Sequence, residues 1–151
     1  MNPILNQHLS VPIIPVPWLD QLETVRGAPT LTGSPPTPLI TEAFALTTFG
    51  PLNGVTPASC SAGMNWAFDK VGIKGTGRAD AVSWLQWGID CPLQRGAVGI
   101  FRWDDGSHHV SCCDHIIDAN IAAFLGFNQG HFVQMSNYYR KYLIGTRWPG
   151  K

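Results

Sequence analysis

The sequence predicts an α+β domain in which helices pack on one face of a curled antiparallel sheet of about five strands. Two observations lead to this fold class. Up to residue 88 the apolar residues recur at helical spacing, and after Pro92 they fall into short runs separated by turn residues. A helical part followed by a strand-rich part is typical of α+β architecture. The 151 residues are enough for one well-packed domain, which we place at 17–151.

The part before this domain, residues 1–16, is interrupted by prolines and predicts an extended arm that lies on the domain or is mobile. Helices follow, with Pro17 suited to the first turn of the first one and Gly72 and Gly88 as stops for the last two. We expect helices at 18–26, 38–47, 60–71 and 79–87.

Strands are expected where short β-like runs follow one another after Pro92. The sequences Asp104-Asp105-Gly106 and Asn128-Gln129-Gly130 are turn signals between them. We expect strands at 97–103, 108–114, 120–127, 132–136 and 143–148.

Charge and hydropathy exclude several classes of partner. The chain has ten basic and ten acidic residues with no basic run, so we expect neither nucleic acid nor an anionic membrane as its partner. No apolar run approaches the roughly 20 residues that cross a bilayer, so no membrane insertion is predicted. No Lys or Arg precedes Arg26, which argues against a secretory signal peptide and for synthesis in the cytoplasm.

Cys60 is the first candidate for chemistry, because it lies where a loop ends and a helix begins. Unpaired backbone N–H groups and the positive end of the helix dipole favour the thiolate there. The alternative is a small buried residue at the start of a core helix. Adjacent Cys112 and Cys113 point to opposite faces of a strand, so at most one of them pairs with Cys91, and we do not expect a disulfide.

A thiol nucleophile needs a base and a third group that orients the base. The second strand begins with two histidines, and its alternation predicts which side chains share a face. One face carries His109, Ser111 and Cys113, and the other carries His108, Val110 and Cys112. If the second set lies in the layer away from the helices, His109 meets Cys60. The amides of Asn128 and Gln129 are then candidates to hold the His109 tautomer.

Three other groups of residues have competing interpretations. Trp66, Trp84 and Trp87 at helical spacing favour a core role over a sugar platform. Trp103 is the better candidate for substrate contact, and Asp104 with Asp105 forms either a solvated turn or a holder for a cationic diamino-acid side chain. The soft ligands near the second strand are candidates for a zinc site, but their spacing fits no recurrent pattern, and strand alternation divides them between two faces. Those ligands are His108, His109, Cys112, Cys113, Asp114 and His115. We predict neither a metal nor a cofactor.

Several motifs follow one another in the order seen in a bacterial and phage group of NlpC/P60-like cysteine peptidases, which the chain resembles over roughly residues 17–149. They are Pro17-Trp18-Leu19, Cys60-Ser61-Ala62 with Asn65-Trp66, Val71-Gly72-Ile73-Lys74-Gly75-Thr76-Gly77, Ser83-Trp84-Leu85-Gln86-Trp87-Gly88, Pro92 with Gly96-Ala97-Val98-Gly99-Ile100-Phe101, His109-Val110, Asn128-Gln129 and Gly145-Thr146-Arg147-Trp148-Pro149. The resemblance implies a papain-like fold. It also implies hydrolysis of amide bonds within the peptide of peptidoglycan, or between that peptide and the glycan, as in the related CHAP amidases.

Carried onto this sequence, the resemblance makes Cys60 the nucleophile, His109 the general base and Asn128 the orienting amide, with Gln129 as the alternative. The oxyanion would be met by the Cys60 N–H and the Ser59 hydroxyl. The sequence departs from the family pattern in Gly63-Met64, which replaces a bulkier pair, and in a polar, cysteine-rich stretch at 111–115. These departures concern the shape of the groove.

The resemblance also sets expectations for biology. It suggests a monomeric phage endolysin or a secreted antibacterial effector that acts on the cell wall, the effector having an immunity protein as partner. The alternative is a catalytically inactive member of the same fold that binds cell wall or serves as a phage structural module.

Overall fold

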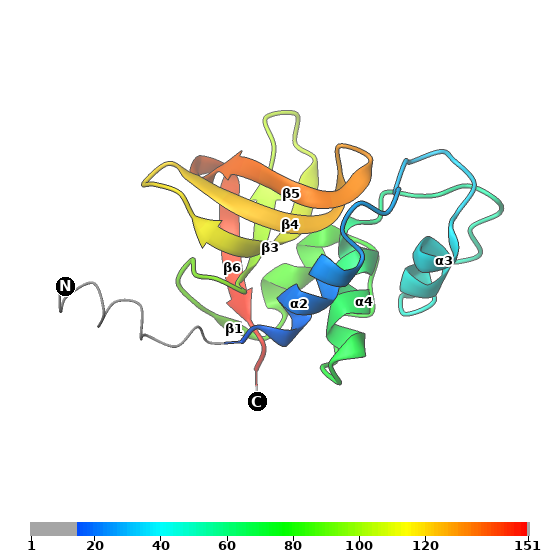
Figure 1. The fold of residues 1–151 in the computed structure, drawn as a ribbon, viewed down its shortest axis with the longest axis horizontal. Coiled ribbons are helices and arrows are strands. Elements are labelled where there is room, and N and C mark those ends of the chain that lie inside the picture. The colour runs from blue at the N-terminus through cyan, green and yellow to red at the C-terminus, as the bar shows by residue number, and fades with distance from the viewer. Residues whose placement is uncertain (1–14, 151) are drawn as a thin grey trace, which may run out of the picture.

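The computed structural model describes residues 15–150 of the chain. Figure 1 shows a curved sheet with the helices gathered against one side of it, and α3 at the end of long loops. The expected arm at 1–16 therefore lies outside the described residues except for its last two. Of these, Val16 is buried in the core. No helix of the described part has both the length and the apolar character needed to cross a membrane.

Three α-helices occur where the sequence predicts them. They are α2 (Pro17–Thr24), α3 (Pro38–Phe44) and α4 (Cys60–Lys70). Proline occupies the first turn of both α2 and α3, and the Thr37 hydroxyl caps α3 by accepting a 3.2 Å hydrogen bond from the Ile40 N–H. Each helix ends one to three residues before its predicted limit.

The fourth expected helix, 79–87, is instead a short 3-10 helix, η1 (Ala81–Gln86). Its tryptophans are held by distant oxygen atoms. The Trp84 indole donates to the Ser61 hydroxyl at 2.8 Å, and the Trp87 indole donates to the Lys74 carbonyl at 2.9 Å. Directly afterwards, at Ile89, the chain pairs with the last strand.

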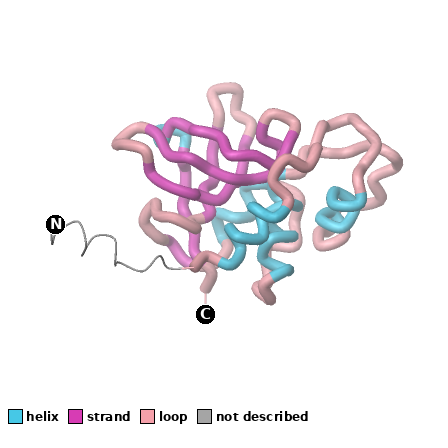
Figure 2. The backbone as a smooth tube through the Cα atoms, in the orientation of Figure 1, coloured by secondary structure: helices cyan, strands magenta, loops and turns pink. Residues whose placement is uncertain are grey.

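The sheet has six strands in the order β1-β6-β2-β3-β4-β5, and every paired neighbour is antiparallel. Figure 2 shows the strands as one continuous layer beside the helices. Their bounds are β1 (Ile89–Asp90), β2 (Val98–Arg102), β3 (His108–Ile116), β4 (Ile121–Gln129), β5 (Phe132–Tyr139) and β6 (Leu143–Trp148). Five correspond to the predicted strands. The two exposed residues of β1 are too few to give an alternating pattern.

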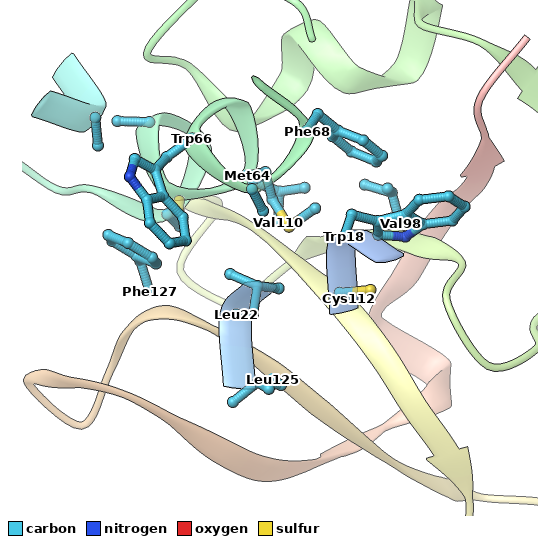
Figure 3. Packing of buried hydrophobic residues seen from close by; sticks show 14 of the residues in the cluster. Trp18, Leu22, Met64, Trp66, Phe68, Val98, Val110, Cys112, Leu125 and Phe127 are labelled. Carbon is cyan, nitrogen blue, oxygen red and sulfur yellow. The ribbon is translucent and has the colours of Figure 1, made fainter. Parts of the chain in front are cut away.

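Two apolar cores lie on opposite faces of the sheet. The larger one joins the helices to the sheet through Val110 and Cys112, as Figure 3 shows. The smaller one includes Phe101, Cys113 and Phe124. The premise that Val110 and Cys112 lie away from the helices is therefore wrong. Val110 and Cys112 are apolar, and they pack in the larger core because more apolar surface is removed from water there.

Helix α4 approaches the sheet closely because Gly63 has no side chain. A Cβ atom at that position would lie 2.2 Å from Cγ of Phe127 on β4. On the other side of the helix, Asn65 donates to the carbonyls of Ser61 and Arg78, and its oxygen accepts from the Gly77 N–H at 2.8 Å. These contacts fix the helix between the sheet and the loop that precedes η1.

Candidate active site

Cys60 is the first residue of α4, and Ser59 before it has non-helical backbone angles. The Ser59 carbonyl accepts the first intrahelical bond from Gly63 at 2.9 Å. The N–H groups of the first turn are left without helical partners, and the dipole presents its positive end there. The thiol lies in this environment with the residue 6% exposed.

The Cys60 thiol reaches the sheet where β3 is paired on one side only. The ladder between β3 and β4 starts at Cys112, so His109, Val110 and Ser111 pair with β2 but not with β4 among the described residues. The backbone N–H of Val110 is one of the groups that help to lower the pKa of the Cys60 thiol. This opening explains how the thiol meets His109 although His109 lies on the face away from the helical core.

The Cys60 thiol and the His109 imidazole are neighbours, and each shifts the pKa of the other. Burial alone would raise the pKa of the Cys60 thiol, but the hydrogen bond and charge of His109 outweigh it, with help from the N–H groups of Val110 and Ser61, so the pKa is lowered. Burial likewise disfavours the His109 imidazolium. The thiolate and Gln129 outweigh this effect and raise the pKa of His109. Both shifts favour the thiolate–imidazolium form.

Burial dominates at the other three cysteines and raises the pKa of each. That of Cys113 is raised to about 12, that of Cys112 is raised well above its usual range, and that of Cys91 is raised. All four cysteines are free thiols. Cys60 is therefore the thiol that is ionised most readily.

The side chain that meets His109 is Gln129, at the end of β4. Its Oε1 lies 3.1 Å from His109 Nε2 and also accepts a 2.5 Å hydrogen bond from the Ser111 hydroxyl. Its Nε2 donates to the carbonyls of Phe124 and Gln134, at 3.0 and 2.7 Å.

These four bonds determine the orientation of the amide and the state of the histidine. The two carbonyls can only accept, so the NH₂ group of Gln129 faces them and Oε1 faces the ring. His109 Nε2 must then carry a proton and donate it. The other ring nitrogen, Nδ1, is left for the Cys60 thiol, which is the tautomer that a general base requires.

Asn128, which we expected to orient the histidine, has another position. Its backbone has φ 61°, and its side-chain oxygen accepts from the Thr32 hydroxyl at 3.4 Å. A shift in strand register between Gly126 and Gln129 accompanies this left-handed residue. The irregularity directs Gln129, the alternative, to His109 in place of Asn128.

Two residues of this arrangement were not singled out from the sequence. Ser111 holds the Gln129 oxygen, and Gly126 leaves the room for both. A Cβ atom at Gly126 would lie 2.5 Å from Ser111 Oγ and 2.9 Å from Gln129 Oε1. The signal for Ser111 was its place two residues after His109 on the same face of the strand.

An aromatic wall surrounds the other side of the His109 ring. Trp103 is stacked at 6.1 Å between ring centres, Tyr138 meets the ring edge-on at 5.7 Å, and Phe101 lies at 6.1 Å. Trp103 is half-buried and therefore both touches the histidine and reaches the surface. Trp66 and Trp84 are buried, as expected for core residues.

The two acidic residues of the adjacent turn differ from each other. Asp104 accepts from the Tyr142 hydroxyl at 3.0 Å. Asp105 accepts from the backbone and hydroxyl of Ser107, at 2.9 and 2.6 Å, which lowers its pKa. Asp105 is thus engaged in its own turn, whereas Asp104 contacts the short 3-10 helix η2 (Arg140–Tyr142) that precedes β6.

Two further expectations concern Ser59 and metal ligands. The Ser59 hydroxyl is buried and has no hydrogen-bond partner among the described residues, although it immediately precedes the nucleophile. Within residues 15–150, no three His, Cys, Asp or Glu side chains converge as they would around a metal ion. In particular, Asp114 pairs with Arg95 and His115 at the surface.

The site can carry out nucleophilic acyl transfer. It has a thiol with a lowered pKa, a histidine in the required tautomer and an amide that holds the histidine.

No family model matches the chain, and no curated protein matches it significantly. Among solved structures, the P60 domain of an antigen from M. avium subspecies paratuberculosis superimposes with a TM-score of 0.55 and 18% identity, covering 88% of this chain and 91% of that one. The chain thus has the fold of a P60 domain.

Proposed function

We propose that this chain hydrolyses an amide bond in the peptide part of peptidoglycan, as an endopeptidase or an amidase, by a Cys60-His109-Gln129 mechanism. The observation that carries the proposal is the arrangement of the thiol beside the imidazole, with the imidazole 3.1 Å from the fully bonded amide of Gln129. The P60-like fold supports the choice of the cell-wall peptide as substrate. It does so by analogy of fold.

In the proposed mechanism the Cys60 thiolate attacks the carbonyl carbon of the scissile amide. The tetrahedral intermediate collapses, the C–N bond breaks, and the His109 imidazolium gives its proton to the leaving amine. Neutral His109 then takes a proton from water, whose oxygen attacks the thioester and releases the acid and the free thiol. Gln129 keeps the ring in one orientation through both halves of the cycle.

The negative oxygen of the intermediate requires donors in a site that excludes water. The Cys60 N–H is at the start of α4, where helix geometry leaves it without a partner. The Ser59 hydroxyl is the second donor in this proposal. A buried hydroxyl without a partner in the resting protein is costly, and an oxyanion would satisfy it during the reaction.

The proposed hydrolysis suits two alternative biological roles. In one, the protein is a phage endolysin that reaches the wall after release by a holin. In the other, it is an effector delivered into a rival's periplasm, and an immunity protein protects the producer. A neighbouring gene for a holin or for an immunity protein distinguishes them.

Digestion of purified peptidoglycan tests the proposal, with mass spectrometry of the released muropeptides. We expect the wild-type protein to release fragments with a new amine and a new carboxyl group, which also identify the bond. Cys60→Ala should release none. Cys91→Ala is the matched control, since Cys91 directly follows the short strand β1 and has a raised pKa, and it should retain activity.

Two results would overturn the proposal. The first is release of the same fragments by Cys60→Ala. The second is the absence of any product from walls of several peptide types with the wild-type protein, which would favour a binding module with this fold.

A further inference from the structure

A surface hollow adjoins Trp103, one of the residues of the aromatic wall. Its volume is about 380 Å³. The residues that line it come from the end of β2, the following turn, the segment before β6 and the start of β6: Arg102, Trp103, Asp104, Lys141, Tyr142 and Ile144. Trp103 thus belongs both to this hollow and to the surroundings of His109.

The hollow has two cationic side chains without anionic partners. Neither Arg102 nor Lys141 forms an ion pair with a carboxylate of residues 15–150. Lys141 is held in place by aromatic rings, its Nζ lying 5.1 Å from the centre of Tyr142 and 5.6 Å from that of Tyr139. Asp104 brings one negative charge, and its Oδ2 is engaged by the Tyr142 hydroxyl. Cations therefore outnumber anions around this hollow.

Because the hollow lies near His109, we relate it to the leaving-amine side of the scissile bond. His109 protonates the leaving amine, so the amine fragment must pass over the imidazole, whereas the acyl fragment stays on Cys60. Trp103 stacks beside His109 and contacts Tyr142 at 5.4 Å between ring centres. The aromatic wall thus leads from the proton donor to the cationic hollow.

A second hollow, of about 590 Å³, adjoins the segment that precedes the nucleophile. Its lining includes Pro57 and Ala58, which lead directly into Ser59 and Cys60. There Arg78 is paired with Asp80 at 2.8 Å. The excess of unpaired positive charge is therefore a property of the His109 side.

We propose that the hollow formed by Arg102, Trp103, Lys141 and Tyr142 binds the leaving-amine fragment of the substrate and recognises a carboxylate on it. This inference rests on the proposed hydrolysis for its assignment to the amine side. The carboxylate lies between Arg102 and Lys141, and the fragment's backbone or side chain packs on Trp103. Substrates whose amine fragment carries a free carboxylate are preferred over those in which it is amidated.

The test measures binding of product-like probes to the full-length wild-type protein by ¹H–¹⁵N NMR. The probes are alanyl-alanine, its C-terminal amide, and alanyl-glutamate with only the terminal carboxyl amidated. The third probe distinguishes a side-chain carboxylate from a terminal one. We expect shifts of the Trp103 indole N–H and the Lys141 and Tyr142 amides, with at least one acidic probe binding about fivefold more tightly than the amide, the most that an exposed ion pair contributes.

Charge variants separate this hollow from general charge effects. Lys141→Gln and Arg102→Gln should remove the preference for the acidic probe, and Asp104→Asn should increase it. Arg140→Gln is the matched control, because it removes the same charge one residue from Lys141 but outside the hollow. It should leave the preference unchanged.

The outcomes decide this inference separately from the hydrolysis. Equal binding of acid and amide, no binding of any probe, or a preference that persists in Lys141→Gln and Arg102→Gln would overturn it, even if the protein digests peptidoglycan. Selective binding through this hollow by a protein that digests no wall would support the binding site and refute the proposed hydrolysis.

Discussion

The amide oxygen of Gln129 lies 3.1 Å from Nε2 of His109, and both N–H groups of the same amide are donated to backbone carbonyls. Gln129 is therefore unable to rotate its amide without breaking four hydrogen bonds, those to His109, Ser111, Phe124 and Gln134. The histidine is held by a group that is itself rigidly held.

Gln129→Ala should lower kcat on peptidoglycan by on the order of 10²-fold, because the ring of His109 loses its orientation. The variant should also lose about 1–3 kcal/mol of unfolding free energy, since buried partners of the amide become unpaired. Initial rates measured well below the melting temperature separate the two effects.

Asn128→Gly is the matched control for that variant. Glycine accepts the φ of 61° at this position, so the backbone irregularity is kept while the side chain is removed. The rate should stay within a few-fold of wild type. A large loss in Asn128→Gly with little loss in Gln129→Ala would reverse the assignment of the orienting amide.

The pH dependence of Cys60 follows from the two pKa shifts. The pKa of Cys60 is lowered, so its alkylation by iodoacetamide should already be fast below the ordinary thiol range near 8.5 and should be lost as the pH falls through the lowered value. Hydrolysis needs the imidazolium as well. The pKa of His109 is raised, so hydrolysis should decline only as the pH rises through that raised value.

Peptide-resolved mass spectrometry of the alkylated protein measures this profile for each cysteine. His109→Ala should move the inflection of Cys60 upward, since the largest influence that favours its thiolate is removed. Cys91 serves as the internal reference. An inflection of Cys60 that matches that of Cys91, or that ignores His109→Ala, would contradict the ion pair.

Ser59→Ala tests the second oxyanion donor by two measurements that should move in opposite directions. Stability should be unchanged or higher, because a buried hydroxyl without a partner is removed. The kcat should fall by about 10²–10³-fold, the usual loss for one oxyanion donor. A variant with wild-type kcat would show that the hydroxyl takes no part in the reaction.

Gly63→Ala should destabilise the protein although alanine is the better helix former. The new Cβ would lie 2.2 Å from the Phe127 ring, and overpacking of this kind costs about 1–3 kcal/mol, more than the gain of about 1 kcal/mol in helix propensity. Chemical denaturation measures the net change. Phe127→Leu in the same chain should recover part of it, and additive effects of the two substitutions would argue against the clash.

Much of the fold was predictable because its patterns are local. The starts of α3 and α4 and the five longer strands follow from prolines, glycines and alternation. The 3-10 helix η1 was not, because its form depends on distant oxygens that hold the indoles of Trp84 and Trp87. Such contacts have no signature within a short window of sequence.

The candidate site was predictable in its residues more than in its geometry. Cys60 and His109 could be paired from the sequence, but the face of β3 that carries Val110 could not be placed correctly. The reason is that the β3–β4 ladder stops before His109, which lets the thiol reach the opposite face. The choice between Asn128 and Gln129 depended on a register shift in β4, which alternation does not reveal.

The residue at position 126, a glycine in this chain, gives a criterion for judging whether a related sequence is an active enzyme. Its φ is not in the left-handed region, so what it supplies is the space that the Ser111 hydroxyl and the Gln129 amide occupy. Any side chain there would push the amide away from the imidazole. A homologous chain that keeps the cysteine, histidine and glutamine but replaces this glycine should therefore be a pseudoenzyme, and its sequence alone would identify it as one.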